Sequence, residues 1–275
     1  MHLGVIGLGA IGQALIAALD GRDGSFGVTR LSLLARTESR ATAQSHLTAG
    51  GPLARDAHVY TDATDLAAAR PDLVVECAGH AAVTAHLPVV LRSGIDVVLA
   101  SVGSLAGKGC EALLRRAAEE GGARLILPSG AIGGIDLVSA LALSGQPMQL
   151  QYRGIKPPAA WAGSPAETRL DLGKVTEPAV HFTGTAREAA TAYPKNANVA
   201  ATLALAGPGL DHVTVELIAD PDATGNIHDY TVTTDAARIA MRIEGRASAG
   251  NARTSASTML SLLREIRNRT GHVVI

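Results

Sequence analysis

The glycines that follow the first apolar run of the chain have a spacing that suits phosphate binding. Gly7 permits a tight turn, Gly9 leaves room for the backbone to approach a pyrophosphate, and Gly12 lets a helix pack closely on the preceding strand. The start of that helix adds free N–H groups and the positive end of its dipole. The pattern predicts a dinucleotide site, with a purely structural glycine turn as the alternative. The predicted contacts are Gly7, Gly9, Ala10, Ile11 and Gly12.

The end of the second apolar run bears on which dinucleotide is bound. An acidic residue at this point commonly holds the ribose 2′-hydroxyl of NAD. Here the run ends in Ala35-Arg36-Thr37, without a carboxylate at the tip. Because a guanidinium matches phosphate geometry, we expect Arg36 to contact a 2′-phosphate and NADP to be used at least as well as NAD. An ordinary solvated loop arginine is the alternative.

Two further polar segments, Glu76–His80 and Ala100–Ser104, each follow a predicted strand, and Ser129–Gly134 lies where the first domain passes into the second. Ligands collect at the carboxyl edge of a parallel sheet, so Ala78 and Gly79 are predicted to contact the cofactor. His80 is interpreted either as a capping or solvent-facing histidine or as a contact to the cofactor ribose. The glycines of Ser129–Gly134 permit close approach of the backbone to a nicotinamide ring.

Two later clusters combine groups suited to anion binding or proton transfer. Residues Tyr193–Asn198 join a cation to amides ahead of a predicted helix. His228 lies close to Asn226 and Asp229, either of which could orient an imidazole for general acid–base catalysis near neutral pH. A polar residue at a strand edge is the plainer interpretation of this histidine.

Residues 1–128 alternate short apolar runs, polar or glycine turns and Ala/Leu-rich segments with helical spacing, which predicts a parallel α/β sheet. Helices are expected to begin near Ala10, Ser39, Ala81 and Cys110. The predicted strands are Leu3–Ile6, Arg30–Leu34, His58–Tyr60, Leu73–Glu76, Asp96–Leu99 and Arg124–Leu127.

Beyond residue 128 the pattern changes to strands of period two, such as Val213–Leu217 and Ile239–Ile243, which predicts a largely antiparallel sheet. A helix over Ile135–Leu143 opens this part, and residues 156–178 are expected to form an ordered loop. A final helix over Ser255–Arg267 is expected to return to the first domain. The predicted domains are therefore 1–128 with about 252–275, and 129–251.

The composition describes a compact globular protein. Its 275 residues are 47% apolar and 18% charged, with a formal net charge of -1. This balance gives no global field for nucleic acid or an anionic membrane, and no apolar stretch approaches the roughly 20 residues of a membrane span. We expect a cytoplasmic protein whose cysteines, Cys77 and Cys110, are reduced, and no metal site.

Taken together, these motifs resemble the L-aspartate dehydrogenase family over essentially the whole chain. The glycine turn is shared by many dehydrogenases, whereas the order and spacing of the later elements are more specific. The segments that carry the resemblance are Gly7–Gly12, Val75–His80, Ser101–Ser104, Leu127–Gly133, Tyr193–Ala201, Ile218–Pro221, Asn226–His228 and Asn251–Ser255.

The resemblance implies an N-terminal Rossmann domain joined to an α+β domain of the dihydrodipicolinate-reductase type, in a homodimer. It also implies oxidative deamination of L-aspartate with NAD or NADP, through iminoaspartate to oxaloacetate and ammonia, with the imine available for pyridine-nucleotide synthesis. His228 matches the catalytic histidine of the family, and Ala131 and Asn198 match its contacts on the nicotinamide side. Arg36 departs from members that have an acid there, so strict NAD preference is not expected.

In the implied mechanism, hydride leaves Cα of an aspartate with a neutral amine, and water attacks the resulting iminium. His228 could take the proton from that water. The two substrate carboxylates need cationic or N–H partners. The candidates are Lys195 with Asn196, Lys156 and the helix start after Gly134.

Two other functions remain possible from the sequence. One is another two-domain NAD(P)-dependent reductase of amino acids or imines, or one acting on a semialdehyde or a dihydropicolinate. An aldehyde-oxidising relative would need a nucleophilic cysteine where this chain has Gly130-Ala131-Ile132. The other is a non-catalytic protein that senses NAD(P), which would have no reason to keep Asn226 and His228.

Overall fold

The computed structural model describes residues 1–21, 26–248 and 251–274, which form two compact units. The first unit contains Met1–Ser101, Gly109–Pro128 and the chain from Thr258 onward; the second contains Val102–Lys108 and Ser129–Ser257. Two limits differ from those expected from the sequence. Residues 102–108 lie in the second unit, and the chain re-enters the first unit at Thr258 rather than near residue 252.

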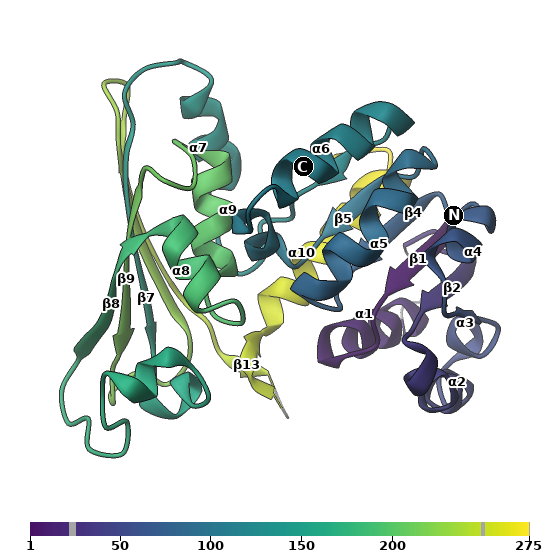
Figure 1. Cartoon of the computed structure of the whole chain (residues 1–275), viewed down its shortest axis with the longest axis horizontal. Coiled ribbons are helices and arrows are strands. Elements are labelled where there is room, and N and C mark those ends of the chain that lie inside the picture. Colours follow the sequence, from purple (N-terminus) through teal and green to yellow (C-terminus); the bar gives the residue numbers. More distant parts are fainter. Residues whose placement is uncertain (22–25, 249–250, 275) are drawn as a thin grey trace. The chain divides into compact units, whose positions relative to one another are not determined.

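The first unit is built on a six-stranded parallel sheet with the order β3-β2-β1-β4-β5-β6, the Rossmann arrangement. Its strands are β1 (His2–Ile6), β2 (Arg30–Leu34), β3 (His58–Tyr60), β4 (Leu73–Glu76), β5 (Val97–Leu99) and β6 (Leu125–Ile126). The predicted strands are confirmed, with the last two shorter than expected. Almost every residue of β1, β2, β4 and β5 is buried because helices cover both faces of the sheet (Figure 1).

The helices of the first unit are α1 (Ala10–Asp20), the 3-10 helix η1 (Thr37–Ser39), α2 (Arg40–Thr48), α3 (Pro52–Arg55), α4 (Ala63–Ala68), α5 (His80–Arg92), α6 (Cys110–Gly121) and α10 (Ala256–Thr270). The final helix α10 packs in this unit, as predicted. Its Leu262 and Ile266 belong to the same buried cluster as Leu3 of β1, and its Arg269 pairs with Asp96 at 2.8 Å.

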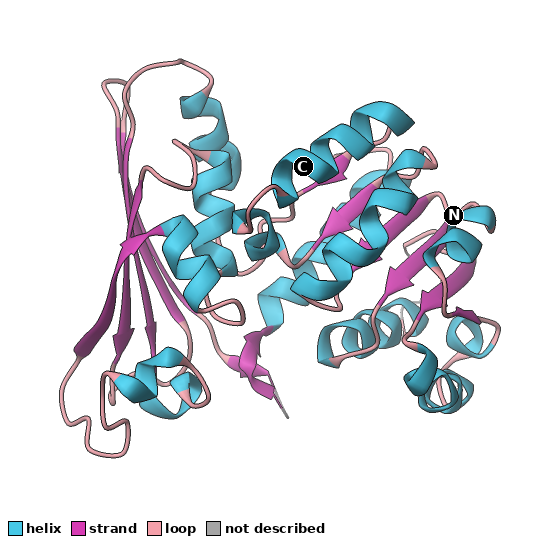
Figure 2. Ribbon diagram, in the orientation of Figure 1, coloured by secondary structure: helices cyan, strands magenta, loops and turns pink. Residues whose placement is uncertain are grey.

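The second unit contains a five-stranded sheet with the order β11-β10-β7-β9-β8. Its strands are β7 (Gln149–Lys156), β8 (Ala179–Thr185), β9 (Val213–Ala219), β10 (Ile227–Thr233) and β11 (Arg238–Glu244). Only the β7–β9 pair is parallel, so the largely antiparallel prediction is confirmed. Helices α7 (Ile135–Ala142), α8 (Ala186–Ala192) and α9 (Asn198–Ala206) lie on one side of this sheet (Figure 2). A short hairpin, β12 (Ala247–Ser248) and β13 (Asn251–Ser255), follows.

Successive side chains of each strand point to opposite faces of the second sheet. On β7, Tyr152 and Lys156 are buried, whereas Gln151 and Arg153 are exposed. The stretch expected to be an ordered loop after β7 contains two 3-10 helices, η3 (Pro158–Trp161) and η4 (Pro165–Thr168). The buried face of this sheet is therefore the one that can carry desolvated polar groups.

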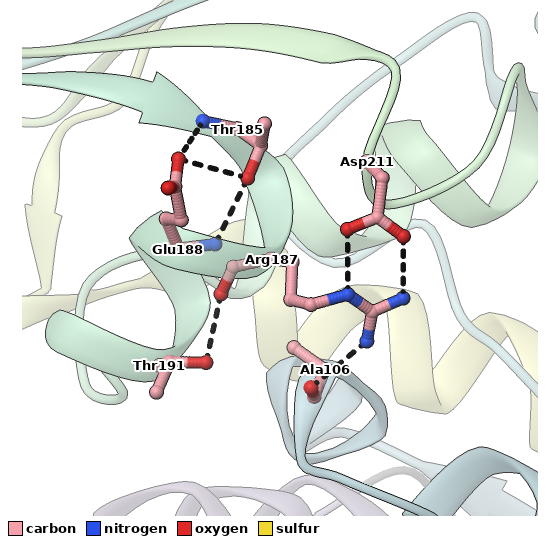
Figure 3. Close-up of polar contacts among 6 residues, drawn as sticks. All are labelled: Ala106, Thr185, Arg187, Glu188, Thr191 and Asp211. Carbon is pink, nitrogen blue, oxygen red and sulfur yellow. Dashed lines mark hydrogen bonds and ion pairs between the residues drawn. The ribbon is translucent and has the colours of Figure 1, made fainter.

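Arg187 explains why residues 102–108 belong to the second unit. Its guanidinium donates to the carbonyl of Ala106, at 3.0 Å, in the 3-10 helix η2 (Val102–Ala106). The same guanidinium forms a forked pair with Asp211 at 2.7 and 2.8 Å (Figure 3). On either side of Arg187, Thr185 and Glu188 form a capping box at the start of α8. None of the helices in the described residues combines the length and apolar character needed to cross a membrane.

Candidate active site

The glycine turn between β1 and α1 is built so that two of its glycines are sterically required and one faces open space. Gly7 has a φ of +97°, and a Cβ there would lie 2.6 Å from the Cβ of Ala78. A Cβ on Gly12 would collide with the carbonyl oxygen of Gly7. A Cβ on Gly9 would meet nothing within 4 Å. The turn thus leaves room beside Gly9, where the sequence predicts the pyrophosphate.

The start of α1 is suited to an anion. Gly9 is its N-cap residue and offers no side-chain cap, and the first turn contains no acidic residue. The N–H groups and positive dipole of this end are therefore not neutralised by the helix's own side chains. Together with the open space beside Gly9, this geometry fits the phosphates of a dinucleotide.

Glu76 shapes the neighbouring loop after β4. Its fully buried carboxylate accepts hydrogen bonds from the N–H groups of Ala78 (2.7 Å) and Gly79 (2.8 Å). It also accepts from the backbone N–H and the hydroxyl of Ser101, both at 3.0 Å. No role for Glu76 was predicted from the sequence, although an acidic residue that ends an apolar strand is unusual. In the structure it joins two predicted cofactor contacts to the end of β5.

His80 is the first residue of α5, and its Nε2 atom is buried without a hydrogen-bond partner. The N-cap residue of that helix is Gly79, whose φ is +121°. His80 is thus not the capping residue that one interpretation of the sequence expected. The burial of this nitrogen also disfavours the solvent-facing interpretation.

Arg36 lies just beyond β2 and is highly exposed, with 76% of its side chain accessible. Its guanidinium is 3.2 Å from the carboxylate of Glu38 and donates weakly to the hydroxyl of Ser39 at 3.4 Å. Glu38 therefore places a carboxylate two residues after Arg36, just beyond the strand tip in which the sequence contains no acidic residue. Because exposed ion pairs contribute at most about 1 kcal/mol, Arg36 can exchange this partner for a phosphate.

In the second unit, His228 of β10 lies on the buried face and is only 4% exposed. Its Nδ1 atom is 2.8 Å from the hydroxyl of Tyr152, on the neighbouring strand β7. Gly154 pairs with His228 and makes room for this hydroxyl, since a Cβ at Gly154 would lie 2.9 Å from it. Burial, with a smaller effect of the Lys156 charge, lowers the pKa of His228 to about 4. The imidazole is therefore neutral at neutral pH.

The residues expected to orient His228 are not the ones that do so. Asp229 points to the other face of the sheet, where it lies 3.6 Å from Arg242. Adjacent residues of a strand must face opposite sides, so this expectation was wrong. Asn226 lies directly before β10, and its Oδ1 is buried without a partner. Tyr152 holds the ring instead, and burial raises the pKa of its phenol, so the hydroxyl keeps its proton.

A second group of buried polar side chains, around His181, lies on this face of the sheet. Lys156 ends β7 and is 5% exposed, with Nζ 5.1 Å from the centre of the Trp161 ring. The ring of His181 packs edge-on against Trp161 at 4.3 Å, and its Nδ1 is 3.2 Å from the hydroxyl of Tyr193. Burial lowers the pKa of Lys156 to about 8, and burial with the charges of Arg169 and Lys156 lowers that of His181 to about 4.

The other predicted residues of the second unit have more varied surroundings. Asn198 begins α9 and accepts a hydrogen bond from the N–H of Gly103 at 2.9 Å, which fixes η2. Ala131 is buried in the turn before α7, while Lys195 is exposed and Asn196 half-buried. The helix start after Gly134 has Asp136 in its first turn, which disfavours an anion there.

No group of three or more His, Cys, Asp or Glu side chains comes together as metal ligands would in the described parts of the chain. The chemistry available is therefore that of two regions. One is a backbone turn with space for phosphates, and the other is a desolvated sheet face with neutral histidines. A Rossmann sheet with such a turn, followed by an α+β unit, defines a two-domain NAD(P)-dependent dehydrogenase.

Comparison with known proteins identifies the family. Residues 136–269 match the family described as aspartate dehydrogenase, C-terminal, and residues 7–128 match the NAD binding domain of homoserine dehydrogenase. The chain is 41% identical to the L-aspartate dehydrogenase of Cupriavidus necator over 276 residues, covering 100% of both chains. It is 52% identical to that of Ruegeria pomeroyi over 200 residues, which cover 73% of this chain and 72% of the relative.

A solved structure agrees with this assignment at the level of the fold. The crystal structure of aspartate dehydrogenase from Thermotoga maritima matches with a TM-score of 0.76 and 24% identity, covering 100% of this chain and 99% of that one. The chain belongs to the aspartate dehydrogenase family. The resemblance found from the motifs is thereby confirmed.

Proposed function

We propose that the protein oxidatively deaminates L-aspartate with NAD or NADP, through iminoaspartate to oxaloacetate and ammonia. The observation that carries this proposal is His228, a buried imidazole that is neutral at neutral pH, in a chain whose full-length relatives are L-aspartate dehydrogenases. The neutral ring has the free lone pair that a general base needs, and its pKa of about 4 makes it a weak base until charge in the filled site raises that pKa. The imine formed on the way can also feed pyridine-nucleotide synthesis.

The first unit would hold the cofactor through its backbone. The open space at Gly9 and the uncapped start of α1 fit the pyrophosphate. The loop after β4, which Glu76 holds in place, lies beside the glycine turn. When bound, the nicotinamide accepts the hydride that leaves Cα of the amino acid. The proposed contacts are Gly7, Gly9, Ala10, Ile11, Gly12, Arg36, Ala78 and Gly79 in the first unit, with Ala131 and Asn198 in the second.

His228 would act as the general base for the hydrolysis of the imine. In the tautomer that donates from Nδ1 to the Tyr152 oxygen, Nε2 carries the lone pair. That nitrogen takes a proton from the water that attacks the imine carbon, and Tyr152 keeps the ring in the required orientation. Lys195 and Asn196 are retained as proposed contacts to a substrate carboxylate.

The decisive experiment measures reduction of NAD and of NADP with a panel of L-aspartate, D-aspartate, L-glutamate, L-alanine and L-malate. L-Aspartate is expected to have the highest kcat/KM with either cofactor. Faster turnover of malate or of another amino acid would assign the protein to a different two-domain dehydrogenase. Cofactor binding without turnover of any substrate would support the sensor function instead.

We also propose that the protein is a cytoplasmic homodimer without a nucleic-acid or membrane partner. Support comes from the exposed apolar side chains of Leu137 on α7 and of Leu143 directly after it, and from β11, which forms an edge of the second sheet. Exposed apolar groups and open strand edges are common features of subunit interfaces. Sedimentation equilibrium should give twice the mass of the chain, and a monomer at micromolar concentration would contradict the proposal.

A further inference from the structure

Lys156 is a buried cation that the protein does not neutralise. The residue as a whole is 5% exposed, and within the described residues its Nζ forms neither a hydrogen bond nor an ion pair with a carboxylate. Its Nζ lies over the ring of Trp161, 5.1 Å from the ring centre. A buried ammonium without an anion is costly, and apolar residues would serve packing better. The position therefore calls for a ligand that brings a negative charge.

His181 provides a second, independent indication of a missing ligand. It is 4% exposed, and its Nε2 is buried without a hydrogen-bond partner. His181 lies at the irregularity in β8 between Val180 and Phe182, and its side chain is buried whereas that of Val180 is exposed. Trp161 packs against both His181 and Lys156, so the two polar groups share one aromatic wall.

Lys156 and His181 can both donate hydrogen bonds to a ligand. The hydroxyl of Tyr193 can donate to Nδ1 of His181 or accept from it, depending on which ring nitrogen carries the hydrogen. In the tautomer that accepts at Nδ1, the neutral ring carries its hydrogen on Nε2, the atom without a partner. An ammonium and an imidazole N–H beside an indole ring make a dehydrated site for one carboxylate.

We propose that Lys156 and His181 form the subsite for the side-chain carboxylate of the substrate. This inference rests on the proposed function, because it assigns one end of an amino acid whose reacting carbon lies at His228. His228 pairs with Gly154, and Lys156 is two residues further along β7, roughly 7 Å away along the strand. No hydrogen bond joins Lys156 to His228 in the described structure. The side-chain carboxylate is one methylene further from the reacting carbon than the α-carboxylate, which suits this offset.

The kinetic test compares L-aspartate with L-alanine, which has only the α-carboxylate. Lys156→Met should lower kcat/KM for L-aspartate by roughly 10- to 150-fold, the usual effect of losing a charge-assisted contact, and leave that for L-alanine within about twofold. Lys156→Arg should restore part of the loss, since it keeps the charge. Lys174→Met is the control, because Lys174 is exposed and paired with Asp171 at 2.8 Å. Equal losses for both amino acids, or no loss for L-aspartate, would overturn the assignment.

A binding measurement separates this subsite from the proposed function. Trp161 is the single tryptophan of the chain, so protein fluorescence reports directly on the cluster. Titration of the full chain with succinate should change this fluorescence, with a Kd at least about tenfold higher in Lys156→Met and a few-fold higher in His181→Phe. The Kd of Lys174→Met should equal that of the wild type.

The two proposals fail in different ways. If the wild type does not oxidise L-aspartate but succinate binding still depends on Lys156, the subsite stands and the proposed reaction is wrong. If L-aspartate is oxidised while succinate binds Lys156→Met as tightly as the wild type, the reaction stands and the subsite is wrong. The absence of any response of the wild type to succinate would also overturn the subsite.

Discussion

The glycine turn of the first unit and the histidine face of the second unit offer binding groups of opposite kinds. Around Gly9 the useful features are backbone N–H groups and empty space, and the surrounding glycines are fixed by contacts with other backbone atoms. Around His228 and Lys156 the useful features are buried side chains whose pKa values are lowered by desolvation. The glycine turn would bind its ligand through its backbone conformation, whereas the side chains around His228 and Lys156 owe their properties to the exclusion of water.

This difference determines how each region responds to change. In a turn made of backbone, added side-chain volume either collides with other backbone atoms, as at Gly12, or fills the space left for the ligand, as at Gly9, but the turn has no titratable group to lose. A desolvated cluster tolerates changes of volume better than changes of charge or of hydrogen bonding. Substitutions at the two regions should therefore separate cofactor binding from catalysis and from acid stability.

The largest effect is expected at Gly9, where Gly9→Val should abolish binding of both cofactors. The φ and ψ of Gly9, -76° and -170°, are accessible to valine, and the added atoms enter open space rather than the core. The free protein should therefore fold normally. Fluorescence titration with NADH and NADPH measures the loss, and Gly173→Val in an exposed loop is the control. Unchanged affinity would place the phosphates elsewhere.

The adjacent Gly12 sharpens the same comparison. Gly12→Ala should lower both cofactor affinity and thermal stability, because its Cβ would collide with the Gly7 carbonyl. Gly9→Val should lower affinity alone. Similar melting temperatures for the two variants would show that the turn adapts to volume, contrary to a site defined by backbone space.

Next in size is the effect of His228→Ala, which should lower kcat for L-aspartate by roughly 10²–10⁴-fold by removing the general base. NADH affinity should stay within a few-fold. Tyr152→Phe removes one neutral hydrogen bond of about 1 kcal/mol and should cost only about five- to tenfold in kcat. Steady-state kinetics and NADH titration check both variants. A rise in KM at constant kcat would make His228 a substrate-binding residue, and lost stability with normal kcat would make it structural.

A smaller effect is expected at Arg36, the one charged side chain among the proposed contacts of the first unit. Arg36→Asp should raise the KM for NADP by the equivalent of about 1.5–3 kcal/mol, because it removes a charge-assisted phosphate contact. The KM for NAD should change far less. Arg55→Asp, a similarly exposed change on α3, is the control. Equal changes for both cofactors would mean that Arg36 is an ordinary surface residue.

The smallest effect concerns acid stability and belongs to the second unit. Histidine in the unfolded chain takes up protons below pH about 6.5, whereas His181 and His228 do so only near a pKa of about 4. The unfolded state binds more protons between these values, so the free energy of unfolding should fall as the pH is lowered through this range. Each ring contributes at most about 2 kcal/mol between pH 7 and pH 5.

Urea unfolding followed by Trp161 fluorescence measures this slope in the second unit, where the single tryptophan lies. His228→Asn should flatten the dependence on pH, and the exposed His46→Asn should not. A slope that is unaffected by His228→Asn would mean that this ring is accessible to protons in the folded state.

The sequence by itself determined the architecture and the glycine turn. Strand positions in the first unit followed from short apolar runs, and the role of Gly7 followed from its place between a strand and a helix. These features depend on residues that are neighbours in the chain, because backbone conformation and side-chain alternation are local. The same alternation also excludes Asp229 as a partner of His228, since adjacent strand residues face opposite sides.

Only the tertiary structure decided which side chains meet. Tyr152 reaches His228 across 76 residues through the pairing of β7 with β10, and Trp161 joins Lys156 to His181 from separate segments. Arg187 likewise assigns η2 to the second unit. No local pattern specifies such contacts, because strand order is set by the packing of the whole sheet. Their pKa values depend on burial, which is a property of the folded chain alone.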